Sequence, residues 1–161
     1  MNPESLFQTI QKHVFCSPVI LHDYVRKFES NCWQRSTLTN TPVSALNIKP
    51  CTGELVNGVV FEVDEEGMKK LRLRESGYSV IDVEVHGYMD HQKLSAITFL
   101  DESSETFTFA TNDPNQHQYL SICIQGASRF GEGFEELFKQ HTFIETIDLS
   151  EYLITHKNFS F

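Results

Sequence analysis

Apolar and polar residues alternate with a period of two through much of the middle of the chain. The most regular stretch covers residues 78–87, where Ile81, Val83 and Val85 share one face and the residues between them are polar. Such alternation is typical of a strand with one face buried and the other in water. The other predicted strands are residues 19–28, one or two short strands within 33–48, then 58–63, 94–99 and 105–110.

Clusters of turn-forming residues separate these segments. Residues 50–54 include a proline and a glycine, and Asn57-Gly58 is a frequent turn pair, so both positions are predicted turns. Segments 94–99 and 105–110 are joined by a short polar stretch, and we expect them to pair as a hairpin.

Helical periodicity, with apolar residues three or four positions apart, occurs near both ends of the chain and once between strands. Asn2 followed by Pro3 predicts a capped helix start, and the apolar stripe extends this helix to about residue 14. Asp64 is the predicted cap of a short helix over residues 65–75. Two helical stripes follow Asp113-Pro114, and a last helix is predicted over residues 148–156.

The order of these elements indicates the fold class. Strands dominate the middle of the chain, helices lie at both ends, and no repeat or linker interrupts the 161 residues. We therefore expect a single α+β domain over residues 1–161, with a mixed, mainly antiparallel sheet or partly closed β-barrel and flanking helices.

Composition removes several classes of partner. The chain has 13 Lys and Arg against 22 Asp and Glu, and the net charge of −9 repels a phosphate backbone, so no nucleic acid partner is expected. No apolar run approaches the ~20 residues of a membrane span. The first residues lack the pattern of a signal peptide, so we expect a cytoplasmic protein with reduced cysteines.

Common catalytic and metal-binding motifs are missing from the sequence. The seven histidines show no metal-ligand spacing, so no metal site is expected. Residues 126–133 are rich in glycine but lack the Lys-Ser/Thr ending of a phosphate loop, and an interhelical turn is the better interpretation. No serine hydrolase elbow occurs, while a Cys-His pair stays open because no cysteine stands out from the others.

Glu75 is the carboxylate with the most definite local context. It ends the predicted helix over 65–75, and Gly77 and Tyr78 lead from it into the next strand. One interpretation is an ordinary solvated helix end. The other is a carboxylate aimed into a cavity from a helix-to-strand corner, where it acts as a general acid or base.

The neighbouring segments favour the second interpretation. Residues 57–63 (NGVVFEV), a short helix, then residues 73–78 (LRESGY) and the strand SVIDVEV resemble the γ-glutamylcyclotransferase-like family, which includes ChaC-like and AIG2-like proteins. Upstream, residues 18–24 (PVILHDY) are similar to another strand of that family. The resemblance covers about residues 2–88, and the helical remainder agrees in general character.

The resemblance implies a reaction and roles for two residues. Glu75 matches the family's general acid/base, and Tyr78 would line the pocket or contact the substrate, unless it is a plain core aromatic. The α-amino group of a small γ-glutamyl amine or peptide would attack its own side-chain carbonyl, which closes 5-oxoproline and releases the amine. The family needs neither metal nor other cofactor for this transferase- or lyase-type chemistry.

One part of the family pattern is missing before Met1. The family begins with a strand and a Y-G-S-(L/N) loop that binds the substrate carboxylate, and residues such as 2–6 follow directly after it. Without that strand the sheet has an unfilled position, so we expect dimerisation through the gap. An in-frame Y-G-S-L upstream would favour the enzyme, and a stop codon there would favour an inactive protein.

These observations lead to one preferred function and two alternatives. The preferred function is a γ-glutamylcyclotransferase-like enzyme with Glu75 as acid/base. The first alternative is a catalytically inactive member of the same fold that binds a small metabolite or a protein. The second is an unrelated α+β domain.

Overall fold

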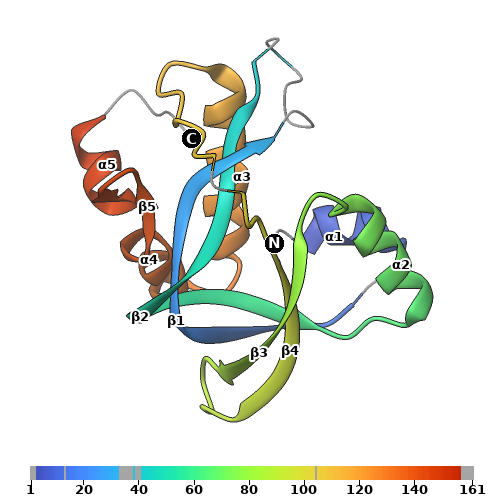
Figure 1. Ribbon diagram of the computed structural model, residues 1–161. Coiled ribbons are helices and arrows are strands. Elements are labelled where there is room, and N and C mark those ends of the chain that lie inside the picture. Colours follow the sequence, from blue (N-terminus) through green and yellow to red (C-terminus); the bar gives the residue numbers. More distant parts are fainter. Residues whose placement is uncertain (1–2, 13, 33–37, 39–40, 104, 157–161) are drawn as a thin grey trace.

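Five helices and six strands make up the described part of the structure, which is a computed structural model (Figure 1). It describes residues 3–12, 14–32, 38, 41–103 and 105–156. The predicted cap at Asn2 and residues 33–37 and 39–40 of the predicted strand region lie outside this set. The elements are α1 (Pro3–Ile10), β1 (Cys16–Cys32), β2 (Val43–Phe61), α2 (Glu65–Arg74), β3 (Ser79–Gly87), β4 (Lys93–Leu100), α3 (Pro114–Ser128), α4 (Glu132–Gln140), β5 (Thr142–Ile144), β6 (Ile147–Asp148) and α5 (Leu149–Thr155).

Two long antiparallel strands, β1 and β2, form the centre of the fold. Their register runs from Cys16↔Phe61 to Cys32↔Val43, so β2 continues through both predicted turns, and those two predictions are wrong. Residues 51–54 of β2 instead lie opposite the single residue Asp23, where the register shifts. Gly53 takes a φ of +87° there, and its N–H donates to Asp23 Oδ1 at 2.9 Å. Gly53 therefore allows the backbone to form a bulge within β2, and the chain does not reverse direction there.

Strands β3 and β4 form a hairpin beside this ladder. Ser79 pairs with Leu100 and His86 with Lys93. The predicted hairpin between residues 94–99 and 105–110 is wrong, because β4 takes β3 as its partner. Residues 105–110 are not a strand, although the Phe107 N–H donates to the Glu29 carbonyl at 2.7 Å. Periodicity therefore identified the strand at residues 94–99 but not its partner, and it wrongly predicted a strand over residues 105–110.

The sheet is mixed, mainly antiparallel and open. Its strand order is β4-β3-β1-β5-β6, with β2 on the other edge of β1. Strand β3 meets β1 only at Val19↔Gly87 and Ile20↔His86, and the parallel β5 takes the same edge of β1 at Arg26 and Lys27. The predicted α+β class and mixed sheet are confirmed, whereas the predicted barrel is not closed across the described strands.

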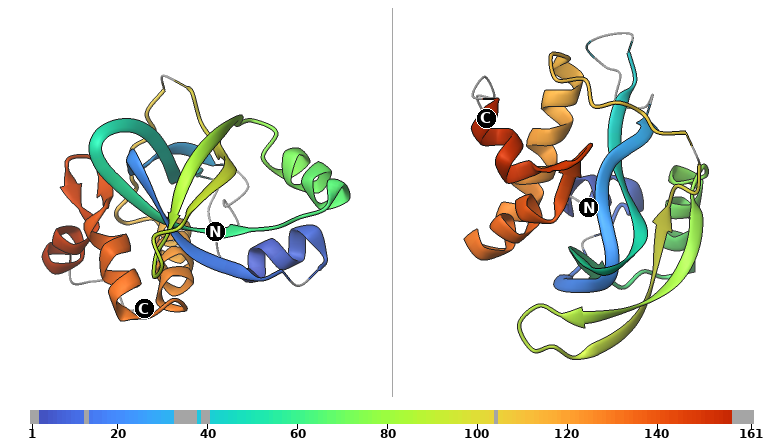
Figure 2. Two further views of the ribbon diagram at one scale, coloured as in Figure 1. Left: turned by 90° about the horizontal axis from the view of Figure 1, so that it is seen from below. Right: turned by 60° about the vertical axis from the view of Figure 1, so that its left-hand side comes forward.

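Helices cover the sheet in two groups (Figures 1 and 2). In Figure 1, α4 and α5 lie on the left of the β1–β2 ladder, α3 lies behind it, and α1 and α2 lie together on the right. The larger core joins Phe28 and Phe109 to the first group, and a smaller core of Leu6, Ile10 and Leu71 joins α1 to α2. The predicted helices are confirmed, although α1 ends at Ile10 rather than near residue 14.

A buried arginine ties the first helical group to the central ladder. The Arg26 side chain donates from Nε to Thr142 Oγ1 at 2.7 Å and from Nη2 to Asn57 Oδ1 at 2.8 Å. Its guanidinium also lies 4.1 Å from the centre of the Phe138 ring. Burial lowers the pKa of Arg26 to about 9, because no solvent stabilises the cation. The network fixes α4 and β5 against β1 and β2.

Candidate functional site around Glu75

Glu75 lies at the corner between α2 and β3. Its N–H donates to the Leu71 carbonyl at 2.9 Å and so ends the helix, and its own carbonyl accepts the Tyr78 N–H at 2.9 Å. These two hydrogen bonds hold Glu75 and Tyr78 at opposite ends of one tight turn. The predicted helix-to-strand corner is confirmed.

The Glu75 side chain is not a solvated helix end. It is 17% exposed, and its Oε1 lies 3.0 Å from Arg74 Nε. Arg74 Nη1 also donates to Thr9 Oγ1 of α1 at 2.7 Å. The guanidinium therefore connects α1 to the carboxylate and fixes its direction. Within the described residues, the carboxylate makes this contact through Oε1.

Tyr78 is half-buried and strongly favours its neutral form. Burial raises the pKa of Tyr78 to about 12, and Cys32, Glu75 and Asp101 act in the same direction. The phenol therefore keeps its proton at all ordinary pH values and can donate a hydrogen bond. These three groups come from three segments of the chain: Cys32 from the end of β1, Glu75 from the end of α2 and Asp101 from the end of β4.

Cys32 and Asp101 were not predicted from the sequence. Cys32 ends β1, and Asp101 directly follows β4. Because Ser79 pairs with Leu100, the next position along the hairpin places Asp101 next to Tyr78. A correct β3–β4 register would have been the signal for Asp101. We predicted this aspartate only as part of a turn.

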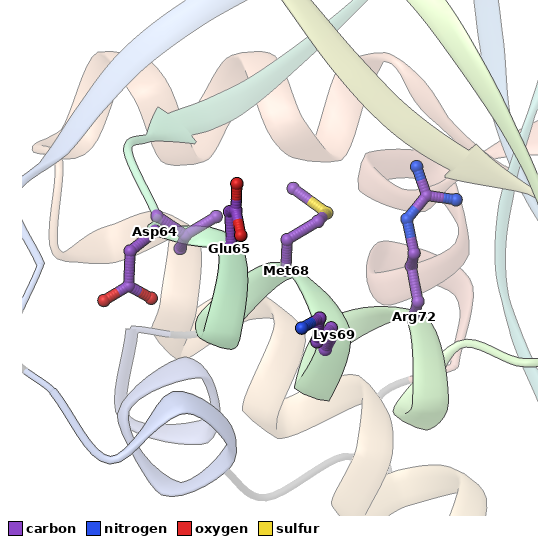
Figure 3. A pocket seen from close by; sticks show the side chains of 6 residues that line it. Asp64, Glu65, Met68, Lys69 and Arg72 are labelled. Carbon is purple, nitrogen blue, oxygen red and sulfur yellow. The ribbon is translucent and has the colours of Figure 1, made fainter.

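An open groove of about 390 Å³ lies along a neighbouring face of α2. Figure 3 shows Glu65, Met68 and Arg72 pointing to the same side of the helix. The end near Asp64 and Glu65 is acidic, and the end near Lys69 and Arg72 is basic. Arg72 precedes Glu75 by three residues, so their Cβ atoms are ~5–6 Å apart on the helix surface. The basic end of the groove therefore adjoins the Glu75 corner.

Other parts of the described chain offer less chemistry. No group of three or more His, Cys, Asp or Glu side chains among these residues is arranged to hold a metal ion. Residues 129–131 form the tight turn between α3 and α4, with Gly131 at a φ of +98°, so the predicted interhelical turn is confirmed. None of the helices in the part of the chain described is long and apolar enough to cross a membrane.

Solved structures with the same architecture include γ-glutamyl cyclotransferases. One such enzyme superposes with a TM-score of 0.65 at 23% identity, covering 94% of this chain and 89% of the other. A yeast γ-glutamyl cyclotransferase specific to glutathione gives 0.64 at 14% identity, covering 99% and 94%. An uncharacterized protein from Homo sapiens gives 0.59 at 25% identity, covering 88% and 82%.

The sequence itself matches one family over most of its length. No curated protein matches the chain. The pattern of the family described as ChaC-like protein, however, matches residues 5–153, which include every residue of the Glu75 site. The chain therefore belongs to the ChaC-like family, whose γ-glutamylcyclotransferase-like fold it shares.

Proposed function

We propose that the protein is a cytoplasmic γ-glutamylcyclotransferase-like enzyme that cyclises a small γ-glutamyl amine or peptide to 5-oxoproline. The family membership and the names of the similar structures support this reaction class. The observation that carries the proposal is the largely buried Glu75 carboxylate, which Arg74 orients and which one tight turn joins to Tyr78.

The proposed mechanism uses Glu75 as base and then as acid. Glu75 removes a proton from the substrate α-amino group as its nitrogen attacks the γ-carbonyl carbon. The carboxyl then returns that proton to the leaving nitrogen as the amide bond breaks, so the products are 5-oxoproline and a free amine. Tyr78 donates to the carbonyl oxygen as negative charge develops there. Because the attack is intramolecular, the protein gains most by holding the substrate bent.

The test is direct detection of 5-oxoproline. The purified protein is incubated with γ-glutamyl peptides and γ-glutamyl amines, and 5-oxoproline is followed by NMR. Release from at least one substrate, with an equal amount of free amine, is the expected result. Absence of product with every substrate would contradict the enzyme assignment.

A second candidate function is a binding protein without catalysis. The groove on α2 supports it, because its acidic and basic ends suit a small zwitterion such as a peptide. In that case calorimetry would detect γ-glutamyl peptide binding that Arg72→Gln weakens, while no 5-oxoproline forms.

A further inference from the structure

A buried polar cluster on the β1–β2 ladder holds Asp101, and the proposed mechanism does not use it. Its three members on the ladder are Ser30, Asn47 and Glu29, which are 1%, 5% and 7% exposed. Glu29 lies at the second register shift of β1, between Phe28 and Ser30. Bulges of this kind turn side chains in new directions and are frequent beside active sites.

The Asn47 side chain clamps the backbone of Asp101. Asn47 Oδ1 accepts the Asp101 N–H, and Asn47 Nδ2 donates to the Asp101 carbonyl, both at 2.9 Å. Nδ2 also donates to Glu29 Oε1 at 3.0 Å, and the same oxygen lies 2.8 Å from Lys49 Nζ. Because both ends of the amide are engaged, Asn47 has one orientation, and Asp101 is fixed relative to β2.

The Asp101 carboxylate is held as firmly as its backbone. Ser30 Oγ donates to Asp101 Oδ2 at 2.7 Å, and the Ser103 N–H donates to Oδ1 at 2.8 Å. Asp101 lies one position beyond the Ser79↔Leu100 pair, so the backbone of the hairpin places it opposite Tyr78, and its charge helps to raise the pKa of that phenol. Burying polar groups and a carboxylate costs free energy that an apolar contact would not, which argues that their placement has a role beyond packing.

We infer that Asn47 is a positioning residue of the site: it fixes Asp101 so that the Asp101 carboxylate lies against Tyr78 and keeps that phenol enclosed. Glu29 orients Asn47 by accepting a hydrogen bond from its amide, and Ser30 orients the Asp101 carboxylate by donating to it. None of these three residues touches the reacting atoms. The consequence for catalysis rests on the proposed function, whereas the consequence for Tyr78 does not.

The test compares Asn47→Ala with a matched control, Thr142→Val. Thr142 is also buried, and on the β5 side of β1 it accepts from Arg26 and donates to the Phe138 carbonyl, so its loss removes a buried hydrogen bond that is not part of the Asn47 cluster. Tyr78 is titrated by phenolate absorbance, as the difference between each variant and the same variant carrying Tyr78→Phe. We expect Asn47→Ala to lower the pKa of Tyr78 from about 12 toward its ordinary value, and Thr142→Val to leave it unchanged.

Activity gives the second measurement. For 5-oxoproline release we expect Asn47→Ala to lower kcat by about 10- to 100-fold with a smaller change in KM, since misplacement of a site by ~1 Å has effects of this size. Ser30→Ala removes one hydroxyl and is the variant to use if Asn47→Ala does not fold. We expect it to shift the titration in the same direction.

The outcomes separate the two proposals. An unshifted Tyr78 titration in a folded Asn47→Ala or Ser30→Ala variant would overturn the positioning role, whatever the activity. An equal shift in Thr142→Val would also overturn it, because the effect would then follow stability alone. A wild-type protein that releases no 5-oxoproline would contradict the proposed function but leave the titration test in place.

Discussion

Two residues that are close in sequence, Glu75 and Tyr78, define the site through groups that are distant in sequence. Arg74 contacts the Glu75 carboxylate and also donates to Thr9 of α1, so the same guanidinium connects the two. Tyr78 stays neutral because the surrounding chain buries it and because Asp101 and Cys32 lie near it. The orientation of Glu75 and the pKa of Tyr78 thus depend on the residues around them.

The protonation of Tyr78 makes a measurable prediction. A difference titration between the wild-type protein and Tyr78→Phe is expected to show one phenol with a pKa of about 12. In the unfolded chain a tyrosine loses its proton near pH ~10. Between these two pH values the unfolded state therefore holds fewer protons than the folded state. The contribution of Tyr78 to the free energy of unfolding is complete below pH ~10 and is lost as the pH rises toward about 12.

Equilibrium denaturation at several pH values across this alkaline range measures the decrease in the free energy of unfolding, and Tyr78→Phe is the control. The variant should show a smaller decrease than the wild-type protein, because the group responsible has been removed. A Tyr78 that titrates at its ordinary value would mean that the fold does not enclose the hydroxyl, which would contradict this description of its surroundings.

At the residue scale, only the part of the candidate site that is contiguous in sequence could be predicted. The motif around Glu75 and Tyr78 is contiguous, so its corner geometry could be predicted from caps and periodicity. Asp101 joins it through the β3–β4 register, and Cys32 joins it through the end of β1. Such contacts depend on strand pairing, which local patterns do not determine.

At the element scale, α2 keeps its position through its contact with α1. Leu71 is 2% exposed and packs with Leu6 and Ile10, whereas Leu73 on the same helix is 78% exposed. Leu71→Ala should lower the free energy of unfolding by about 2–5 kcal/mol, because it leaves a cavity in the small core. Leu73→Ala should change it by no more than ~0.5 kcal/mol.

Equilibrium denaturation of both variants tests this prediction. The Leu71 variant should also lose activity near its unfolding midpoint, since α2 carries Glu75. Equal losses of stability in the two variants would show that the α1–α2 contact does not hold the helix in place.

Helices were easier to predict than the long strands, for a physical reason. Asp64 and Asp113 cap α2 and α3 through their own side chains, and such caps can be read locally. In β2, Gly53 belongs to a bulge opposite Asp23 and Pro50 pairs with Tyr24 beside it, although the same residue types also form turns. Only the partner strand distinguishes the two cases.

At the scale of the whole molecule, the open sheet leaves strand edges available. In the described residues, positions 79–85 of β3 have a strand partner only on the β4 side. We predict that a second copy of the chain adds at such an edge and that the protein is a dimer. Light scattering across a range of concentrations measures this, and a monomer at every concentration would contradict it.

The overall class could be predicted, whereas the closure of the sheet could not. Alternation in the middle and helical stripes at both ends were enough to indicate an α+β domain with a mainly antiparallel sheet. Closure depends on which edges meet, and here β3 and β5 share one edge of β1 at different positions. The sequence left an open sheet and a partly closed barrel as alternatives because closure requires pairings that no local pattern encodes.

The central claim is that Glu75 is the acid/base of a cyclotransferase reaction. The most direct test measures 5-oxoproline release by Glu75→Gln, with Glu66→Gln as a control on an exposed glutamate of the same helix. The account predicts that Glu75→Gln lowers kcat by at least about 100-fold while Tm stays close to the wild-type value, and that Glu66→Gln keeps full activity. A Glu75→Gln variant that loses stability yet releases 5-oxoproline at the wild-type rate would contradict the account.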